Sequence, residues 1–337
     1  MTDNQWLAQV QEQILEPDLK ICDPHHHLWD YPHNRYLFDE LLADLRSGHN
    51  VMSTVFMECA SMYRADGPDV MKPVGETEFV QGVAAQSASG QFGDTAVAAG
   101  IVSNADFSLG DAVAPVLEAH MAASGNRFRG IRFSLSWDAS PEITPASSRT
   151  RGLLSDPKFR EGFAYLQRYG LSFDALVYHP QLTELVDLAN AFPEVTFILN
   201  HIGRPLGTGP YAGKRDEVFA DWKKGITAIA ACPNVVVKVG GLGNTISGFD
   251  WHQRPLPPTS TELAKTMAPY YLFCIEQFGA NRCMFESNFP VDKASYSYTV
   301  LWNAFKRITR DFSKSELTAL FHDTAAKAYR LPEIGGE

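Results

Sequence analysis

The chain has 337 residues, of which 45% are hydrophobic and 20% are charged, and its net charge is −10. This acidic balance, without any run of lysine or arginine, argues against a nucleic-acid-binding surface, and no apolar run is long enough to span a membrane. The five cysteines are odd in number and widely spaced, which is typical of reduced core residues rather than of a disulfide framework. Because the polar N-terminal segment lacks the apolar centre of a signal peptide, we expect a cytoplasmic protein.

Strand-like segments alternate with helix-like segments along the chain. Eight short segments rich in β-branched or aromatic residues predict strands: Leu19–Asp23, Met52–Glu58, Thr95–Val102, Phe128–Ser134, Leu171–Val177, Val195–Asn200, Val235–Val239 and Arg282–Glu286. Helical patterns follow them at about 38–47, 75–88, 110–123, 157–169, 181–191, 214–231, 261–278 and 298–311.

Eight such units predict a (β/α)8 TIM barrel, an α/β fold in which parallel strands close into a ring with helices outside. A doubly wound open sheet is the alternative, but no Gly-x-Gly-x-x-Gly motif follows the first strand. We expect residues 1–337 to form one domain, with an N-terminal helix at about 5–15 and an additional C-terminal helix at about 314–331.

Histidines follow three of the predicted strands. The run His25-His26-His27 follows the first strand, and because strand side chains alternate, His25 and His27 are expected to point the same way and His26 the other way. His179 follows the fifth strand and His201 the sixth. In a closed barrel these strand ends converge, so four imidazoles would meet at one mouth, where neutral imidazole is a common zinc or manganese ligand. The alternative is that they only form hydrogen bonds at the strand ends.

Five motifs, spread nearly from end to end, carry a family resemblance in combination. They are Asp23-Pro24-His25-His26-His27-Leu28-Trp29, Phe128-Arg129-Gly130-Ile131-Arg132, Leu199-Asn200-His201-Ile202-Gly203-Arg204-Pro205, Arg282-Cys283-Met284-Phe285-Glu286-Ser287-Asn288-Phe289-Pro290-Val291-Asp292, and the closing Thr324-Ala325-Ala326 to Tyr329-Arg330-Leu331. With them the chain resembles the amidohydrolase superfamily, and within it the amidohydrolase-2 branch of TIM-barrel metal-dependent hydrolases. That branch includes sugar lactonases, 2-pyrone-4,6-dicarboxylate lactonase and zinc-dependent decarboxylases.

The resemblance implies a metal centre and a substrate contact. His25 and His27 match the family's first-strand pair and His179 matches its fifth-strand histidine, so these three are expected to bind one divalent metal ion, zinc or manganese. His201 matches the sixth-strand histidine and is expected to be catalytic. Arg132 matches an arginine that binds a substrate carboxylate or hydroxyls in the lactonase branch. A metal-independent site is the alternative, because the resemblance includes lactonases that hydrolyse without a metal.

Two motifs depart from the family pattern. After the sixth strand the family often has Leu-Asp-His-x-Gly-Lys-Pro, where this chain has Asn200 and Arg204. After the eighth strand the usual Gly-Ser-Asp-Trp-Pro supplies an aspartate that binds metal and takes a proton from water, where this chain has Asn288. An amide cannot act as a base at neutral pH, although it can offer a carbonyl oxygen to a metal or hold a water. No lysine follows the fourth strand to bridge two ions, so a binuclear centre is not expected.

The identity of the general base is therefore open. Asp292, four residues beyond Asn288, is the first candidate. Glu58, at the end of the second strand, is the second, and His252, in the loop after the seventh strand, is the third. Each also has a structural explanation, as an ion-pair partner, a turn cap or a surface residue.

The mouth residues indicate the kind of substrate. Arg132 and Arg204 favour an anionic or hydroxyl-rich molecule, and Trp251 and His252 are expected to contact it. We therefore expect a hydrolase that adds water to the carbonyl of a lactone or related ester in a small carboxylated or polyhydroxylated molecule. The alternatives are a metal-dependent decarboxylase of an unsaturated or aromatic acid, and a homologue that has lost catalysis. Homo-oligomers are common among barrels of this kind, and no nucleic-acid or membrane partner is expected.

Overall fold

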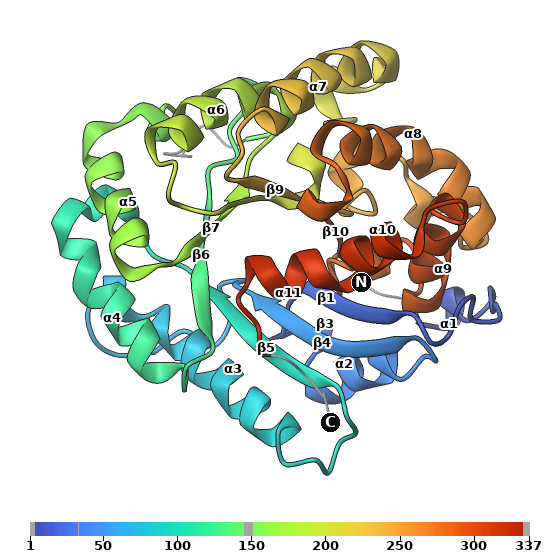
Figure 1. Cartoon of the computed structure of the whole chain (residues 1–337), viewed down its shortest axis with the longest axis horizontal. Coiled ribbons are helices and arrows are strands. Elements are labelled where there is room, and N and C mark those ends of the chain that lie inside the picture. Colours follow the sequence, from blue (N-terminus) through green and yellow to red (C-terminus); the bar gives the residue numbers. More distant parts are fainter. Residues whose placement is uncertain (1–3, 33, 145–150, 333–337) are drawn as a thin grey trace.

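An eight-stranded parallel sheet, rolled into a nearly closed barrel, forms the centre of the molecule (Figure 1). The computed structural model describes residues 4–32, 34–144 and 151–332. The strands follow one another around the barrel in chain order: β1 (Lys20–His26), β4 (Asn50–Met57), β5 (Ala96–Ser103), β6 (Phe128–Ser134), β7 (Ser172–Leu176), β8 (Phe197–Leu199), β9 (Val235–Val239) and β10 (Cys283–Phe285). The predicted (β/α)8 barrel is confirmed.

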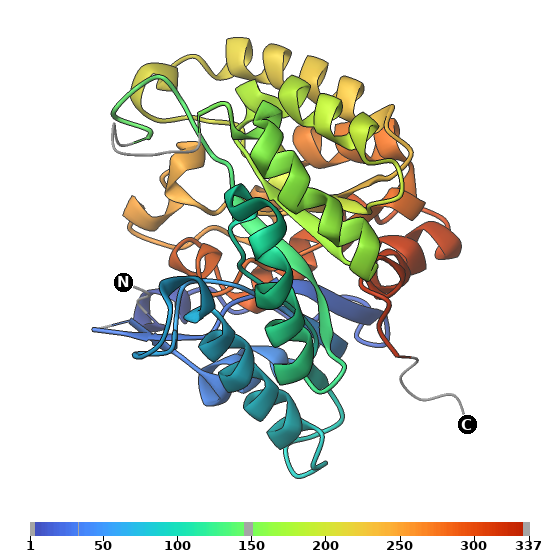
Figure 2. The same cartoon turned by 90° about the vertical axis from the view of Figure 1, so that its left-hand side faces the viewer.

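Helices surround the barrel, and those coloured cyan to green lie in front of the strands in Figure 2. They are α2 (Phe38–Leu45), α3 (Val74–Ser87), α4 (Ala114–Ala123), α5 (Pro157–Tyr169), α6 (Leu182–Ala191), α7 (Arg215–Ala230), α8 (Ser260–Phe278) and α9 (Tyr298–Ile308). The expected C-terminal helix consists of α10 (Lys314–Thr318), a π-helical turn (Ala319–Asp323) and α11 (Thr324–Ala328). Among the described residues, no helix is both long enough and apolar enough to cross a membrane.

Capping chemistry explains why helices begin and end where the sequence predicts. The Asp156 carboxylate accepts a hydrogen bond from the backbone N–H of Phe159 at 2.8 Å, and Pro157 occupies the first turn of α5, where no N–H is needed. Gly170 ends α5 in the left-handed region at φ 63°, where residues with a Cβ are strained. Ser297 caps α9 by accepting from the backbone N–H of Val300.

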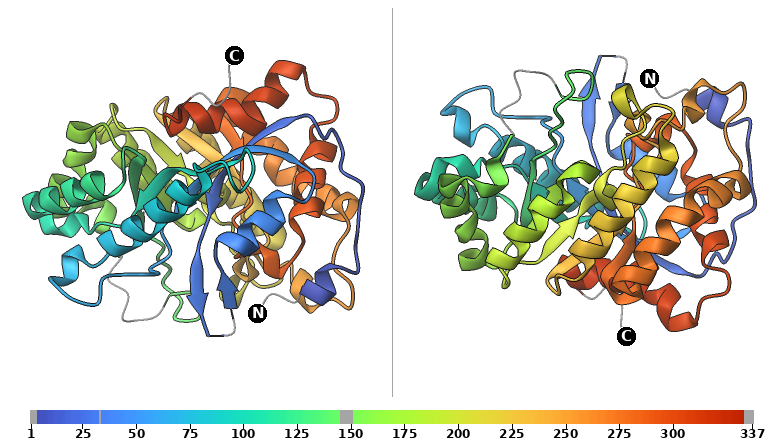
Figure 3. Two further views of the ribbon diagram at one scale, coloured as in Figure 1. Left: turned by 90° about the horizontal axis from the view of Figure 1, so that it is seen from below. Right: turned by 90° about the horizontal axis from the view of Figure 1, so that it is seen from above.

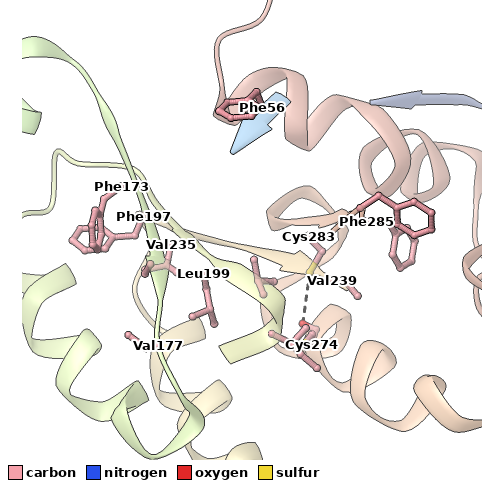
Figure 4. Close-up of a cluster of buried hydrophobic side chains, with 14 of the residues drawn as sticks. Phe56, Phe173, Val177, Phe197, Leu199, Val235, Val239, Cys274, Cys283 and Phe285 are labelled. Atoms are coloured by element: carbon pink, nitrogen blue, oxygen red, sulfur yellow. Dashed lines mark hydrogen bonds between the residues drawn. The ribbon is translucent and has the colours of Figure 1, made fainter. Parts of the chain in front are cut away.

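Aromatic and aliphatic side chains fill the space between strands and helices. Phe173 and Phe197 lie side by side on β7 and β8, near Leu199 and Val235 (Figure 4). Their ring centroids lie 5.8 Å apart in an edge-to-face arrangement, which is one of the arrangements that aromatic pairs prefer. All five cysteines are free, and Cys283 only donates a long hydrogen bond to the carbonyl of Cys274 at 3.7 Å. The prediction of reduced cysteines is therefore confirmed.

The N-terminal helix is much shorter than expected. α1 comprises only Asn4–Leu7, so the prediction of a helix at about 5–15 was wrong. The backbone that follows is held by side chains of α9 rather than by helical hydrogen bonds. Asn303 accepts from the N–H of Leu15 at 3.0 Å and donates to the carbonyl of Gln13 at 2.9 Å. Lys306 donates to the carbonyls of Leu15 and Glu16 at 2.7 and 2.9 Å.

Removing this anchor should weaken the fold. We expect Asn303→Ala to lower the free energy of unfolding by about 1 kcal/mol, because it removes hydrogen bonds from a partly buried N–H and a partly buried carbonyl. Urea unfolding followed by circular dichroism measures the change. A loss below about 0.5 kcal/mol would mean that water replaces the amide at no cost.

A hairpin and the barrel closure shape the carboxyl ends of the strands. The hairpin of β2 (Trp29–Tyr31) and β3 (Asn34–Tyr36) projects from the barrel (Figure 3). β1 meets the segment that follows β10 through a parallel bridge between His26 and Phe289. There the N–H of His27 donates to the carbonyl of Phe289 at 2.8 Å, and the N–H of Asn288 donates to the carbonyl of His25 at 3.0 Å. The first-strand histidines therefore lie directly beside the last strand.

Candidate active site

Three of the four histidines that the sequence predicts at the mouth come together where the strands end. The ring centroids of His25 and His27 lie 4.9 Å apart, and those of His25 and His201 lie 4.5 Å apart. His26 points away and contacts the hydroxyl of Thr54 at 2.9 Å. This arrangement confirms the expected alternation along β1.

Glu286 joins these histidines, and sequence reasoning missed it. Its Oε1 lies 2.6 Å from Nδ1 of His201, and its Oε2 lies 2.8 Å from Nδ1 of His25. The side chain is fully buried, and burial raises the pKa of Glu286 to about 8 against the opposing charge of Lys238. The family motif drew attention to Asn288 instead. The eighth predicted strand ends at Glu286, and strand ends meet at the barrel mouth, so a carboxylate at this position was the available signal.

The backbone around His201 is bent to aim its imidazole. His201 and Ile202 have φ of 53° and 50°, in the left-handed region. Gly241 lies against the side chain of His201, and no larger residue fits there: a Cβ at position 241 would be only 2.4 Å from the Cβ of His201. Nδ1 of His201 faces Glu286, which leaves Nε2 on the other edge of the ring.

The same residues are suited to hold a divalent cation. In the described part of the chain, one ligand atom each of His25, His201 and Glu286 lies within 4.8 Å of the other two. Burial lowers the pKa of His25 and of His201 well below the usual 6.5, so both imidazoles are neutral, which is the form that binds metals. Oε2 of Glu286 is buried, and it lies 2.8 Å from Nδ1 of His25, an atom of the same donor set. The donor set therefore fits a divalent metal.

This set differs from the expected metal ligands. His27 lies beside His25, but its Nδ1 lies 2.8 Å from the carbonyl of Met57, so Nδ1 carries the proton and Nε2 has the lone pair. His179 lies apart from the three-residue group. Its Nδ1 accepts from the N–H of Leu206 at 3.3 Å, and its ring packs edge-on against Tyr211. The expected metal roles of His27 and His179 stay predictions.

Arg132 and Glu58 form one buried unit next to His25. Nε of Arg132 donates to Oε1 of Glu58 at 2.7 Å, and Nη2 donates to the carbonyl of Glu58. Nη1 lies 3.2 Å from Nε2 of His25. Because Glu58 already binds a guanidinium, its carboxylate is poorly placed to serve as a free base.

Asp292 is also saturated by hydrogen bonds. Its Oδ1 accepts from the amide of Asn288 at 2.7 Å, and its Oδ2 accepts from the N–H of Gly243 at 2.9 Å and the hydroxyl of Tyr296 at 2.7 Å. Burial raises the pKa of Asp292 to about 7 in spite of these donors. The amide of Asn288 thus has a clear function as a donor to a buried carboxyl group.

Restoring the family's aspartate should therefore be harmful. Asn288→Asp places a second carboxylate where a donor stands 2.7 Å from Asp292, and like charges raise the pKa of such a pair. When the folded-state pKa of a carboxyl group is raised, folding is favoured while the group is protonated and this advantage is lost as pH rises. We therefore expect the variant to lose about 2 kcal/mol of unfolding free energy near pH 8 and less near pH 5. Unfolding by urea at both pH values measures it, against the native protein. An equal loss at both values would contradict this explanation.

The remaining expected substrate contacts are divided between the mouth and the surface. Arg204 stacks over the ring of Tyr178 at 4.7 Å and donates to the hydroxyl of Ser136 at 3.1 Å. Trp251 is buried and stacks on Phe249, with ring centroids 4.6 Å apart.

His252 is exposed, and Nε2 of its ring lies 3.4 Å from Nε2 of Gln253. Its exposed position does not favour the roles of base or substrate contact that the sequence suggested for it. Both roles stay predictions.

A buried lysine is the second residue that the sequence analysis missed. Lys238 lies in β9, and its Nζ is 2.9 Å from Oδ1 of Asp174 and 3.1 Å from Nδ1 of His25. Both Lys238 and Asp174 have fully buried side chains. A lysine among the valines of a predicted inner strand was the available signal, because lysine is almost never buried without a partner.

Known sequences match most of the chain. A family model described as amidohydrolase matches residues 22–331. The uncharacterized protein y4mH of Sinorhizobium fredii is 36% identical over 340 residues, which cover 93% of this chain and 99% of that protein. An L-fucono-1,5-lactonase of Burkholderia multivorans is 28% identical over 225 residues, which cover 66% of this chain and 70% of the lactonase.

Solved structures show the same fold. An amidohydrolase of Burkholderia multivorans with bound HEPES has a TM-score of 0.70 and 25% identity, and covers 93% of this chain and 99% of its own. A second crystal form of the same Burkholderia multivorans amidohydrolase, with bound zinc, has the same TM-score at 24% identity and the same coverage. A putative 2-pyrone-4,6-dicarboxylic acid hydrolase of Pseudomonas putida has a TM-score of 0.60 at 17% identity, covering 93% and 98% of the two chains.

Proposed function

Because this chain belongs to the amidohydrolase family and is an enzyme, we propose that it hydrolyses a lactone of a small carboxylated or polyhydroxylated acid. The name of the relative from Burkholderia multivorans, an L-fucono-1,5-lactonase, supports this class. The observation that carries the proposal is the 2.6 Å contact between Glu286 and Nδ1 of His201. It gives the barrel mouth a neutral imidazole in one defined tautomer.

The proton transfers follow from that tautomer. Nδ1–H of His201 donates a hydrogen bond to Glu286, so the lone pair of the imidazole is on Nε2. Nε2 then takes a proton from the attacking water. The water oxygen bonds to the lactone carbonyl carbon, and the ring C–O bond then breaks. His201 returns the proton to the leaving alkoxide, and the product is the open-chain hydroxy acid.

Arg132 supplies positive charge where the carbonyl oxygen becomes negative. Glu58 fixes the guanidinium through Nε, and Nη1 is directed toward His25 at the mouth. A buried guanidinium held in advance stabilises an oxyanion more strongly than it would in water. Arg204, stacked on Tyr178, offers a second cation to a substrate carboxylate or hydroxyl.

A divalent metal is consistent with the same site. His25, His201 and Glu286 would hold it, zinc or manganese being the ions we expect. Such an ion polarises a carbonyl and lowers the pKa of water. The hydrogen bond from Arg132 to Glu58 is the same with or without it. A lone pair that His201 gave to the ion could no longer take a proton from water, so the base role of His201 belongs to the site without an ion.

A lactone panel tests the proposal. Purified protein is assayed with a pH indicator on L-fucono-1,5-lactone, L-rhamnono-γ-lactone, D-glucono-1,5-lactone and 2-pyrone-4,6-dicarboxylate. We expect hydrolysis of at least one, and a fall in kcat of about 10²–10⁴ in His201→Asn, which tolerates the left-handed backbone. His322→Asn, in the C-terminal π-helical turn outside the site, is the control.

Two results would contradict the proposal. One is no hydrolysis of any lactone by folded protein. The other is equal rates for native protein and His201→Asn. Release of carbon dioxide from an aromatic acid would favour the decarboxylase alternative instead.

A further inference from the structure

Lys238 brings a positive charge into the interior of the barrel, and the proposed reaction does not use it. Its side chain is completely buried on β9, between the buried residues Val237 and Val239. Burying an ammonium group is costly unless an anion pairs with it and hydrogen bonds satisfy its protons. The residues around Lys238 must therefore include the anion and the hydrogen-bond acceptors that stabilise its charge.

Asp174 is the anion that holds Lys238, and three donors converge on one of its oxygens. Oδ1 accepts from Nζ of Lys238 at 2.9 Å, from the amide of Asn200 at 2.8 Å and from the hydroxyl of Tyr329 at 2.7 Å. Nζ also lies 5.2 Å from the centre of the Tyr329 ring, within cation–π range. The amide at position 200, where the family often has an aspartate, thus donates to Asp174, whereas a carboxylate there would repel it.

The same ammonium touches the candidate metal ligands. Nζ lies 3.1 Å from Nδ1 of His25, and that nitrogen lies 2.8 Å from Oε2 of Glu286. A cation bound by His25, His201 and Glu286 would therefore lie within a few ångströms of a fixed positive charge. Two cations at such a separation repel each other strongly in a buried, weakly screened environment.

We propose that the ammonium of Lys238 is a resident cation that weakens divalent-metal binding by His25, His201 and Glu286. It partly neutralises the buried carboxylates that would otherwise attract the metal. The inference concerns the charge of the site, so it holds whichever lactone is the substrate.

Metal titration of a charge-removal variant tests this inference. Native protein, stripped with chelator, and Lys238→Met are titrated with Zn²⁺ and Mn²⁺ in competition with a chromophoric chelator. We expect a Kd at least about tenfold lower in Lys238→Met, equivalent to about 1.4 kcal/mol. An unchanged or higher Kd for both ions would overturn the proposal.

The chain offers a matched control. Lys306 is also buried, and its Nζ lies 3.0 Å from Nδ1 of His49, a lysine–imidazole contact of the same kind outside the site. Lys306→Met should leave the Kd of the metal unchanged. If it lowers the Kd as much as Lys238→Met does, the effect is not local and the proposal fails.

A second variant guards against a folding defect. Asp174→Asn with Lys238→Met removes both charges of the pair, so no buried ion is left without a partner. Circular dichroism verifies its fold. Losing Asp174 offsets part of the gain, but the ammonium is the group that contacts His25, so a metal affinity between those of native protein and Lys238→Met is expected. Affinity equal to or weaker than native in this folded variant would overturn the proposal. Because the readout is metal binding, it is independent of whether any lactone is hydrolysed.

Discussion

Replacing Glu286 with glutamine should lower kcat by a factor of about 10³ and leave KM nearly unchanged. Glu286 accepts from Nδ1 of His201 through Oε1. A glutamine has one accepting oxygen and one donating NH2 group, so it cannot serve the two imidazoles as the carboxylate does. If the NH2 group faces His201, the imidazole adopts the other tautomer, and Nε2 then carries a proton and cannot accept one from water.

The pH profile gives a second readout for Glu286. Its pKa is raised to about 8 by burial, so its ionised fraction grows as pH rises through this range. The ionised form is the one that holds the active tautomer of His201. We therefore expect kcat of the native enzyme to rise with pH through about 8, and this rise to vanish in Glu286→Gln.

Glu76→Gln is the matched control for the glutamate substitution. Glu76 is also buried, and burial raises its pKa to about 8, but its Oε1 accepts from the N–H groups of Cys59 and Ser61. Rates within about threefold of native are expected for this control. Equal losses in Glu286→Gln and Glu76→Gln would mean that the glutamates only stabilise the fold.

Removing the charge of Lys238 should produce the largest change in stability. We expect Lys238→Met to lower the free energy of unfolding by about 3–5 kcal/mol, because Asp174 is left as a buried anion without its cation. Asn200 and Tyr329 still donate to Asp174, but neither carries a charge. Urea unfolding with both circular dichroism and tryptophan fluorescence measures the loss and tests whether unfolding stays cooperative.

A double-mutant cycle separates the interaction energy between Lys238 and Asp174 from the effects of each substitution on other neighbours. Asp174→Asn combined with Lys238→Met should recover most of the loss, because a neutral pair of similar volume needs no compensation. A loss below about 1 kcal/mol in Lys238→Met alone would contradict the expected cost of leaving Asp174 without its cation.

The fold was predictable because its signals are local. Each strand is a short β-branched run ended by turn residues, and helix ends such as Asp156 and Gly170 have capping chemistry readable from neighbouring letters. The N-terminal helix was wrongly predicted because its polar pattern is set by contacts with Asn303 and Lys306, which are distant in sequence.

The candidate site was predictable only in part. The convergence of His25, His27 and His201 follows from barrel geometry alone. Glu286 and Lys238 escaped notice because their importance depends on which side chains face them across the barrel, and no spacing in the sequence reports that. Asp292 and Glu58 were plausible bases by position, but each is already occupied by donors.

Because the barrel closes between its first and last strands, the candidate site can form only after nearly all of the chain has been translated. Asp23 accepts from the N–H of Ser287 at 3.0 Å, across 264 residues of chain, and the hydroxyl of Ser287 donates to the carbonyl of His25 at 3.2 Å, across 262 residues. Contacts of such separation form late, since they must first overcome the entropy of closing a long loop. His25 and His27 are therefore translated long before Glu286. The arrangement of the candidate site is reached only when β10 and the residues after it have docked against β1.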